Sequence, residues 1–185
     1  MRNPYKRKKE PKLVRRNLLD QAAKIAVGSG LSAVTVSAVS AAAGVSKGGF
    51  THHFPSKQDL IDALFEELLN DTEAALSERI KADTVSYGAF TRAYIDIVLN
   101  WDTTIEHKNW AALAALTLNE PQLCKIWADW FSKQVNKYQE TDLELVIVRL
   151  AVDGFWLSNL IGISLPKREQ LYSQLIKETY IKDSS

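Results

Sequence analysis

Apolar residues recur at intervals of three and four positions along almost the whole 185-residue chain. This spacing places them on one face of an α-helix, and the strict alternation that marks a half-buried strand is absent. The chain contains only 5 Pro and 8 Gly, so few positions interrupt a helix. The sequence therefore predicts an all-α protein of about nine helices joined by short loops.

Capping residues and glycines separate short helices in the first third of the chain. Thr35 and Ser46 each precede a helical segment and carry a hydroxyl that can cap it. Gly44 follows the first of these segments, where a left-handed turn is favoured. Ser56 opens a longer amphipathic segment with Asp59 in its first turn. The predicted helices in this part span residues 12–27, 36–43, 46–52 and 56–81.

Apolar stripes predict further helices over residues 90–105, 110–119, 121–138 and 142–163, and from Pro166 onward. Segment 142–163 is apolar nearly all round, which requires burial on both of its sides. Gly154 within it permits close approach of a second helix. We therefore expect this segment to form a homodimer interface. The heptad-spaced residues of that interface are Leu143, Ile147, Leu150, Gly154, Leu157 and Ile161.

The formal net charge of +1 hides an uneven distribution. Residues 1–60 contain eleven Lys or Arg and three Asp or Glu, a difference of +8, and the rest of the chain carries −7. This split is typical of a protein that binds nucleic-acid phosphates through its N-terminal part. Residues 1–11 are predicted to be a flexible basic tail.

Two short helices joined by a Gly-containing turn match a helix-turn-helix, whose second helix enters the major groove of DNA. The second predicted helix carries small or polar side chains outward, and Val45 and Phe50 anchor it inward. Gly48 and Gly49 each lower helix propensity by about 1 kcal/mol relative to Ala. Their presence indicates that another molecule approaches this backbone closely, and DNA fits that position.

The run TVSAVSAAAGVSKGGFTHHFPSKQDLIDALFEE resembles the N-terminal signature of the TetR family of transcriptional regulators. The resemblance covers about residues 12–67 and implies a helix-turn-helix domain over 12–55, followed by a helical effector-binding and dimerisation domain over 56–185. The family usually has Tyr where this chain has Thr51, so a shorter hydroxyl would replace an aromatic one at a phosphate. The implied DNA-contacting residues are Thr35, Val36, Ser37, Ser46, Lys47, Gly48, Gly49, Thr51, His52, His53 and Lys57.

The same resemblance implies that segment 142–163 and the last helix form a four-helix bundle across a two-fold axis, so that a dimer reads a palindromic site. The last helix would add Leu171 and Leu175 to the dimer interface. The family also places a small-molecule site among the C-terminal helices. The aromatic residues expected to line it are Trp101, Trp110, Trp127, Trp130, Phe131 and Trp156.

Two interpretations of these aromatic residues stay open, because rings on helices form either a filled core or the wall of a ligand cavity. Asp153 lies among these apolar residues in the sequence, and a buried carboxylate is unfavourable unless it has a partner. We expect Asp153 to pair with Arg149, one turn back on the same helix. The alternative is that Asp153 faces a cationic ligand beside Trp156, because tryptophan rings attract cations.

Other classes of protein are disfavoured by what the chain lacks. No Ser/His/Asp, Cys/His or paired-carboxylate arrangement appears at useful spacing, so we do not expect an enzyme. His52 and His53 point about 100° apart on a helix, and neither a metal nor another cofactor is expected. The single Cys124 cannot form an intramolecular disulfide. The basic N-terminus and the absence of a long apolar run predict a cytoplasmic protein with no membrane partner.

The sequence thus predicts a homodimeric transcriptional regulator that acts as a repressor. It would bind double-stranded palindromic operator DNA and be released by a small-molecule effector. The alternative is a ligand-independent DNA-binding or co-regulatory protein with a solid aromatic core.

Overall fold

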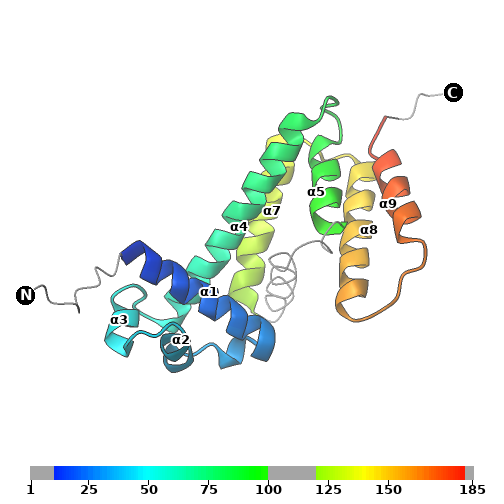
Figure 1. Cartoon of the computed structure of the whole chain (residues 1–185). Coiled ribbons are helices and arrows are strands. Elements are labelled where there is room, and N and C mark those ends of the chain that lie inside the picture. The colour runs from blue at the N-terminus through cyan, green and yellow to red at the C-terminus, as the bar shows by residue number, and fades with distance from the viewer. Residues whose placement is uncertain (1–10, 100–119, 182–185) are drawn as a thin grey trace, which may run out of the picture. The chain divides into compact units, whose positions relative to one another are not determined.

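A computed structural model of the chain describes residues 11–99 and 120–181. Within these ranges the chain forms eight α-helices and one 3-10 helix and no strand (Figure 1), so the all-α prediction is confirmed. None of the described helices is long and apolar enough to cross a membrane. The elements are α1 Pro11–Ser29, η1 Leu31–Ala33, α2 Val36–Ala42, α3 Lys47–Thr51, α4 Lys57–Ala82, α5 Ala89–Leu99, α7 Pro121–Tyr138, α8 Leu143–Leu160 and α9 Arg168–Lys177.

The chain divides into two compact units, one ending at Glu67 and the other beginning at Leu68, so that α4 contributes to both. The boundary inferred from the sequence lies earlier, at the start of this helix. The first unit includes the opening turns of α4 because they bury Leu60, Ile61 and Phe65. Its other buried apolar residues come from α1, α2, α3 and the segments beside them: Leu18, Leu19, Ala22, Ala26, Val34, Val39, Phe50 and Phe54.

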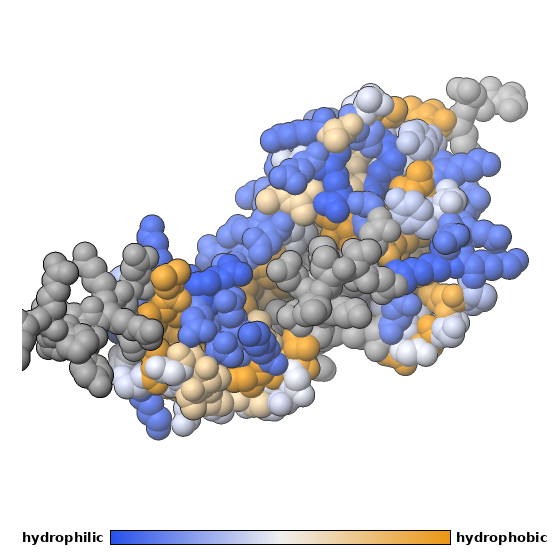
Figure 2. Space-filling view, in the orientation of Figure 1, coloured by the Kyte–Doolittle hydropathy of each residue, from blue (hydrophilic) through white to orange (hydrophobic). Residues whose placement is uncertain are grey.

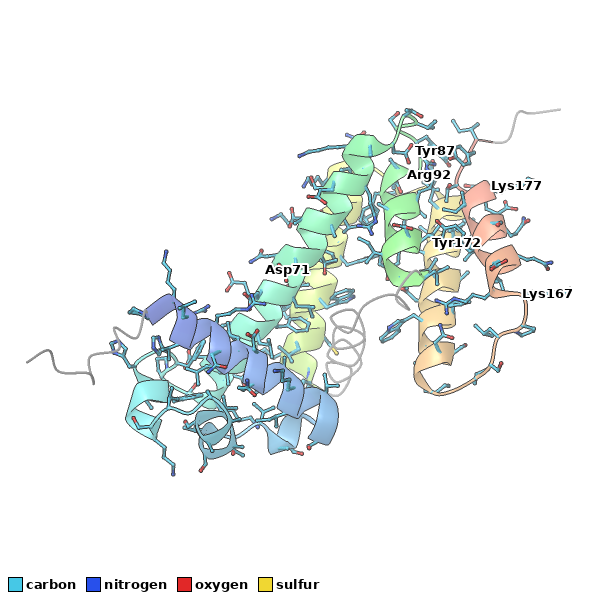
Figure 3. The ribbon with its side chains drawn as sticks, viewed as in Figure 1. Asp71, Tyr87, Arg92, Lys167, Tyr172 and Lys177 are labelled. Carbon is cyan, nitrogen blue, oxygen red and sulfur yellow. The ribbon has the colours of Figure 1, made fainter. Side chains whose placement is uncertain are left out.

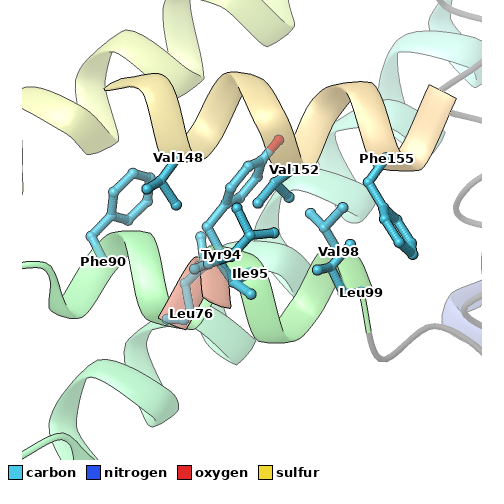
Figure 4. Close-up of a cluster of buried hydrophobic side chains, with 11 residues drawn as sticks. Leu76, Phe90, Tyr94, Ile95, Val98, Leu99, Val148, Val152 and Phe155 are labelled. Atoms are coloured by element: carbon cyan, nitrogen blue, oxygen red, sulfur yellow. The ribbon is translucent and has the colours of Figure 1, made fainter. Parts of the chain in front are cut away.

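The second unit has its core between α5 and α8 (Figure 4). Phe90, Tyr94 and Val98 of α5 pack in one cluster with buried side chains of α8. Those α8 residues are Val148, Val152 and Phe155, spaced so that they share one helix face. Leu76 of α4 and Leu175 of α9 complete the cluster from two sides.

A buried ion pair fixes the start of α5. Glu140 accepts hydrogen bonds from the backbone N–H groups of Phe90 and Thr91 at 2.8 and 2.9 Å, and from the Thr91 hydroxyl at 2.6 Å. Arg149 donates to the Thr91 hydroxyl at 2.7 Å and to the Glu140 carbonyl at 2.8 Å, and its Nη1 lies 3.6 Å from Glu140 Oε2. The expected pairing of Arg149 with Asp153 is therefore wrong, because Arg149 is engaged by groups from other parts of the chain.

A second buried arginine joins the turn between α4 and α5 to the residues after α9 (Figure 3). Arg92 pairs with Asp83 at 2.7 Å, donates to the Thr179 carbonyl at 3.2 Å, and lies over the Tyr180 ring at 4.5 Å. Gly88 is required beside it: its φ is +73°, and a Cβ would lie 2.3 Å from the Thr179 carbonyl oxygen. These contacts hold the end of α9 against α5.

Candidate nucleic-acid interface

Side-chain caps define both helices of the helix-turn-helix. The Thr35 hydroxyl oxygen accepts a hydrogen bond from the N–H of Ala38 at 3.1 Å, and the Ser46 hydroxyl oxygen accepts one from the N–H of Gly49 at 3.0 Å. Gly44 turns the chain between α2 and α3 with φ +66°. The capping roles predicted for Thr35 and Ser46 are confirmed, since each satisfies an N–H that the helix itself leaves free.

Burial separates the anchors of this motif from the groups that it presents. Val39 of α2 and Phe50 of α3 are fully buried. Seven of the eleven residues expected at the DNA are exposed: Thr35, Ser37, Ser46, Lys47, Gly48, Thr51 and His52. The other four, Val36, Gly49, His53 and Lys57, are half-buried. All eleven lie in the first unit, ten of them in α2, α3 or the residues next to these helices, and Lys57 at the start of α4.

The hydroxyl groups differ in what they can still offer to a phosphate. The cap oxygens of Thr35 and Ser46 accept hydrogen bonds, so each O–H is left to donate to an acceptor such as a phosphate oxygen. The Thr51 hydroxyl instead lies 3.2 Å from both the Lys47 and the Gly48 carbonyl oxygens, to which it donates. In the unbound protein the Thr51 hydroxyl therefore donates to carbonyl groups of its own helix and not to an outside acceptor.

Basic groups lie beside α3 and at the start of α4. The Lys57 ammonium donates to the Leu31 carbonyl at 3.1 Å, which ties α4 to η1 and uses one of its three N–H groups. The Arg15 guanidinium lies 5.0 Å from the centroid of the Phe54 ring, just beyond α3. Burial, followed by repulsion from His52 and Arg15, lowers the pKa of His53 below its ordinary value.

Neither the backbone conformation nor the contacts of the described chain require glycine at positions 48 and 49. A Cβ at Gly48 would meet only the Ser46 hydroxyl at 3.9 Å, and one at Gly49 would make ordinary contacts at 3.4 Å or more. Neither residue has a positive φ. The fold would therefore accept Ala at both positions, although Ala favours a helix more than Gly does.

The aromatic residues of the second unit lie partly in its core. Phe131 of α7 contacts the Phe90 and Tyr94 rings at centroid distances of 6.0 and 5.5 Å, and Trp156 packs against the same cluster. Trp127 and Trp130 contact each other, with centroids 5.3 Å apart. All four are half-buried. Trp101 and Trp110 lie outside the described residues.

Polar groups lie beside the aromatic face of α7, by which we mean Trp127, Trp130 and Phe131. Burial alone would raise the pKa of Glu73 on α4. The Lys137 ammonium, followed by the N–H groups of Trp130 and Gln134, together have the larger effect, so the pKa of Glu73 lies below its ordinary value. Lys137 donates to Glu73 at 3.3 Å, whereas neither of the other two N–H groups reaches full hydrogen-bond geometry. Gln134 is 1% exposed, and its amide oxygen has no donor within the described ranges. Sequence reasoning did not single out Gln134.

One face of α8 is apolar and exposed. It consists of Leu143 (68% exposed), Ile147 (55%), Leu150 (63%), Leu157 (43%) and Ile161 (62%), with the exposed Gly154 between them. We call these six residues the α8 outer face. Apolar side chains are visible on the surface around the end of α8 and the loop after it (Figure 2). Leu171 of α9 is also exposed, but Leu175 is 8% exposed and packs in the core, so it leaves little surface for a partner.

Comparison with curated proteins finds transcriptional regulators. The chain is 26% identical over 157 residues to the HTH-type transcriptional repressor KstR2 of Mycobacterium tuberculosis, and the matched region covers 78% of each protein. It is 25% identical over 188 residues to the HTH-type transcriptional regulator BetI 1 of Chromohalobacter salexigens, which covers 92% of each.

Solved structures share the fold. The multidrug binding protein EbrR complexed with malachite green superposes with a TM-score of 0.71 at 20% identity, covering 90% of this chain and 98% of that one. A TetR family member from Streptomyces coelicolor gives 0.69 at 18% identity, covering 91% and 99%.

Family profiles match both parts of the chain. The profile described as bacterial regulatory proteins, tetR family, matches residues 18–64, which contain α2, α3 and the start of α4. A second profile, the tetracyclin repressor-like C-terminal domain, matches residues 88–180, half of the 185-residue chain. Together with the capped helix-turn-helix, these matches show that the chain belongs to the TetR family of bacterial regulatory proteins.

Proposed function

We propose that this protein is a homodimeric repressor that binds palindromic operator DNA through α2 and α3 and is released by a small-molecule effector held in its second unit. The observation that carries the proposal is the pair Gly48 and Gly49 at the surface of a capped reading helix, where the chain itself has room for Ala. Membership of the TetR family supports the regulatory role.

The groups that the first unit presents support DNA binding. Helix N-termini at Val36 and Lys47 offer free N–H groups to phosphates. The free O–H groups of Thr35 and Ser46 and the ammonium of Lys47 add donors of the right kind. Small residues at Gly48 and Gly49 then allow the helix backbone to approach base edges.

The exposed α8 outer face supports dimerisation. Its five apolar side chains are exposed in the single chain, and a continuous apolar stripe of this kind marks an interaction site. A second copy of the chain presents the same stripe, so a two-fold axis can bury both. A Cβ at Gly154 would meet no atom within 4 Å, so close packing against a partner helix explains this glycine too.

Effector binding is supported by the half-buried aromatic face of α7 and by the unpaired amide oxygen of Gln134. Ligand sites combine apolar and aromatic walls with a few polar groups that orient the ligand. Crystal structures of EbrR, a protein of the same fold, hold malachite green, ethidium and imidazole. An effector releases DNA only if it binds the two states of the dimer with different affinity.

Replacing Lys47 with Ala is expected to weaken binding to a duplex selected by the wild-type protein, by about 10-fold, and to reduce the salt slope by about 1, because one phosphate contact is lost. Fluorescence anisotropy over a range of salt concentrations measures both. Lys24→Ala, which removes an exposed Lys of α1, is the matched control. Equal affinities for Lys47→Ala and Lys24→Ala would contradict the assignment of α3 as the reading helix.

Replacing Gly48 with Ala is expected to keep or raise the melting temperature, because Ala gains up to about 1 kcal/mol of helix propensity. Operator affinity is nevertheless expected to fall at least about 10-fold, which corresponds to about 1.4 kcal/mol, because the added methyl group would meet the DNA. Gly28→Ala in α1 is the control, since a Cβ there also meets no atom within 4 Å. Undiminished operator binding by Gly48→Ala would overturn this role of the glycine.

A further inference from the structure

Asp153 of α8 is a carboxylate in an aromatic and apolar setting. Its Oδ1 accepts a hydrogen bond from the hydroxyl of Tyr94, which is 6% exposed and belongs to the core cluster. The Tyr94 ring contacts Phe131, and Trp156 follows Asp153 by three residues on α8, nearly one helical turn. The carboxylate is therefore held by the hydroxyl of a core tyrosine whose ring lies against Phe131.

No cation of the described residues neutralises this carboxylate at ion-pair distance. Arg149, one turn back, uses its donors on Thr91 and on Glu140, with which it forms the buried ion pair. Burial raises the pKa of Asp153, and the Tyr94 hydrogen bond and the Arg149 charge lower it by less. A half-buried charge with one neutral donor is unfavourable in the unliganded protein.

Both polar atoms of the Gln134 side-chain amide, in the same unit, lack a hydrogen-bond partner within the described residues. The amide oxygen of Gln134 is buried without a donor in the described part of the chain, and Gln134 follows Phe131 by three residues on α7. Phe131 in turn contacts Tyr94, which bonds Asp153. Because the Gln134 amide leaves both a donor and an acceptor unpaired, it does not select the charge of a ligand, whereas the Asp153 carboxylate favours a donor with positive charge.

We propose, on the basis of the effector role proposed above, that the effector is an organic cation with an aromatic or apolar body and that Asp153, oriented by Tyr94, binds its positive charge. Aromatic faces at Phe131 and Trp156 would bind the body of such a ligand and add attraction for the charge. The Asp153 carboxylate would then select a cation over a neutral compound of the same shape.

Calorimetric titration at neutral pH with (4-hydroxyphenyl)trimethylammonium, a monocation, and with 4-tert-butylphenol, an uncharged compound of the same shape, tests this selection. The wild-type protein is expected to bind the cation at least about 10-fold more tightly, since a charge-assisted bond contributes about 1.5–3 kcal/mol. Asp153→Asn is expected to abolish that preference with a melting temperature no lower than wild type. Asp129→Asn, an exposed carboxylate of α7, is expected to keep the preference.

Equal binding of the two compounds, an unchanged preference in Asp153→Asn, or no binding of either compound at millimolar concentration would each overturn the cation assignment. The regulatory function is tested separately. Operator binding is measured first, and neutral and anionic compounds are then screened for release of the protein from the operator. Release by a neutral or anionic compound would leave the regulatory function standing while the cation assignment fails.

Discussion

Replacing Leu150 with Glu is expected to convert the protein from a dimer to a monomer and to weaken operator binding by about 100-fold to 10,000-fold, the range lost when two linked binding modules act singly. Leu150 is 63% exposed in the single chain and lies in the middle of the α8 outer face. In a dimer this position would be buried, and an unpaired carboxylate there is strongly unfavourable. In the monomer it would simply face water, so folding is expected to be retained.

Sedimentation equilibrium measures the association, and anisotropy measures the operator affinity. Val85→Glu is the matched control, because Val85 is also an exposed apolar residue (40%) of the second unit but lies outside the α8 outer face. Gly154→Leu provides a second variant that improves helix propensity while obstructing a partner helix. A Leu150→Glu protein that remains dimeric would show that the α8 outer face is not the interface.

Replacing Glu140 with Gln is expected to lower the free energy of unfolding by about 3–5 kcal/mol, the range found when one partner of a buried ion pair is removed. Glu140 accepts three hydrogen bonds at the start of α5 and faces the Arg149 guanidinium. The amide NH₂ of Gln would point donors at donors in this site, and Arg149 would stay buried without a counter-charge.

Chemical denaturation of the dimer at fixed protein concentration measures this change. The double variant Glu140→Gln with Arg149→Met is expected to be less destabilised than the sum of the two single variants, because the second change removes the unpaired charge. A loss below about 1 kcal/mol in Glu140→Gln, the size of an ordinary hydrogen bond, would contradict the assigned role of the pair.

Local signals explain why the helix-turn-helix could be predicted closely. The predicted helices at residues 36–43 and 46–52 agree with α2 and α3 to within one residue at each end. Thr35, Gly44 and Ser46 act on N–H and carbonyl groups only a few residues away, so the sequence contains all the required information. The exposure of the α8 outer face also follows from heptad spacing, since the opposite face is the one that packs on α5.

Long-range competition explains what the sequence did not reveal. An Arg149 and Asp153 pair four residues apart is worth about 0.2–0.5 kcal/mol, whereas Thr91 and Glu140 offer Arg149 several buried hydrogen bonds at once. No spacing rule connects these residues. Leu175 was likewise assigned to the interface by analogy, but it fills a position in the core that only the packing of α9 on α5 creates.

Selection of bound duplexes from a random DNA pool, followed by the mass of the selected complex, tests the central claim most directly. We expect an inverted repeat, bound by two copies of the chain or a multiple of two, with both half-sites required for full affinity. Selection of asymmetric sequences bound by a single chain, or enrichment of no sequence at all, would contradict it.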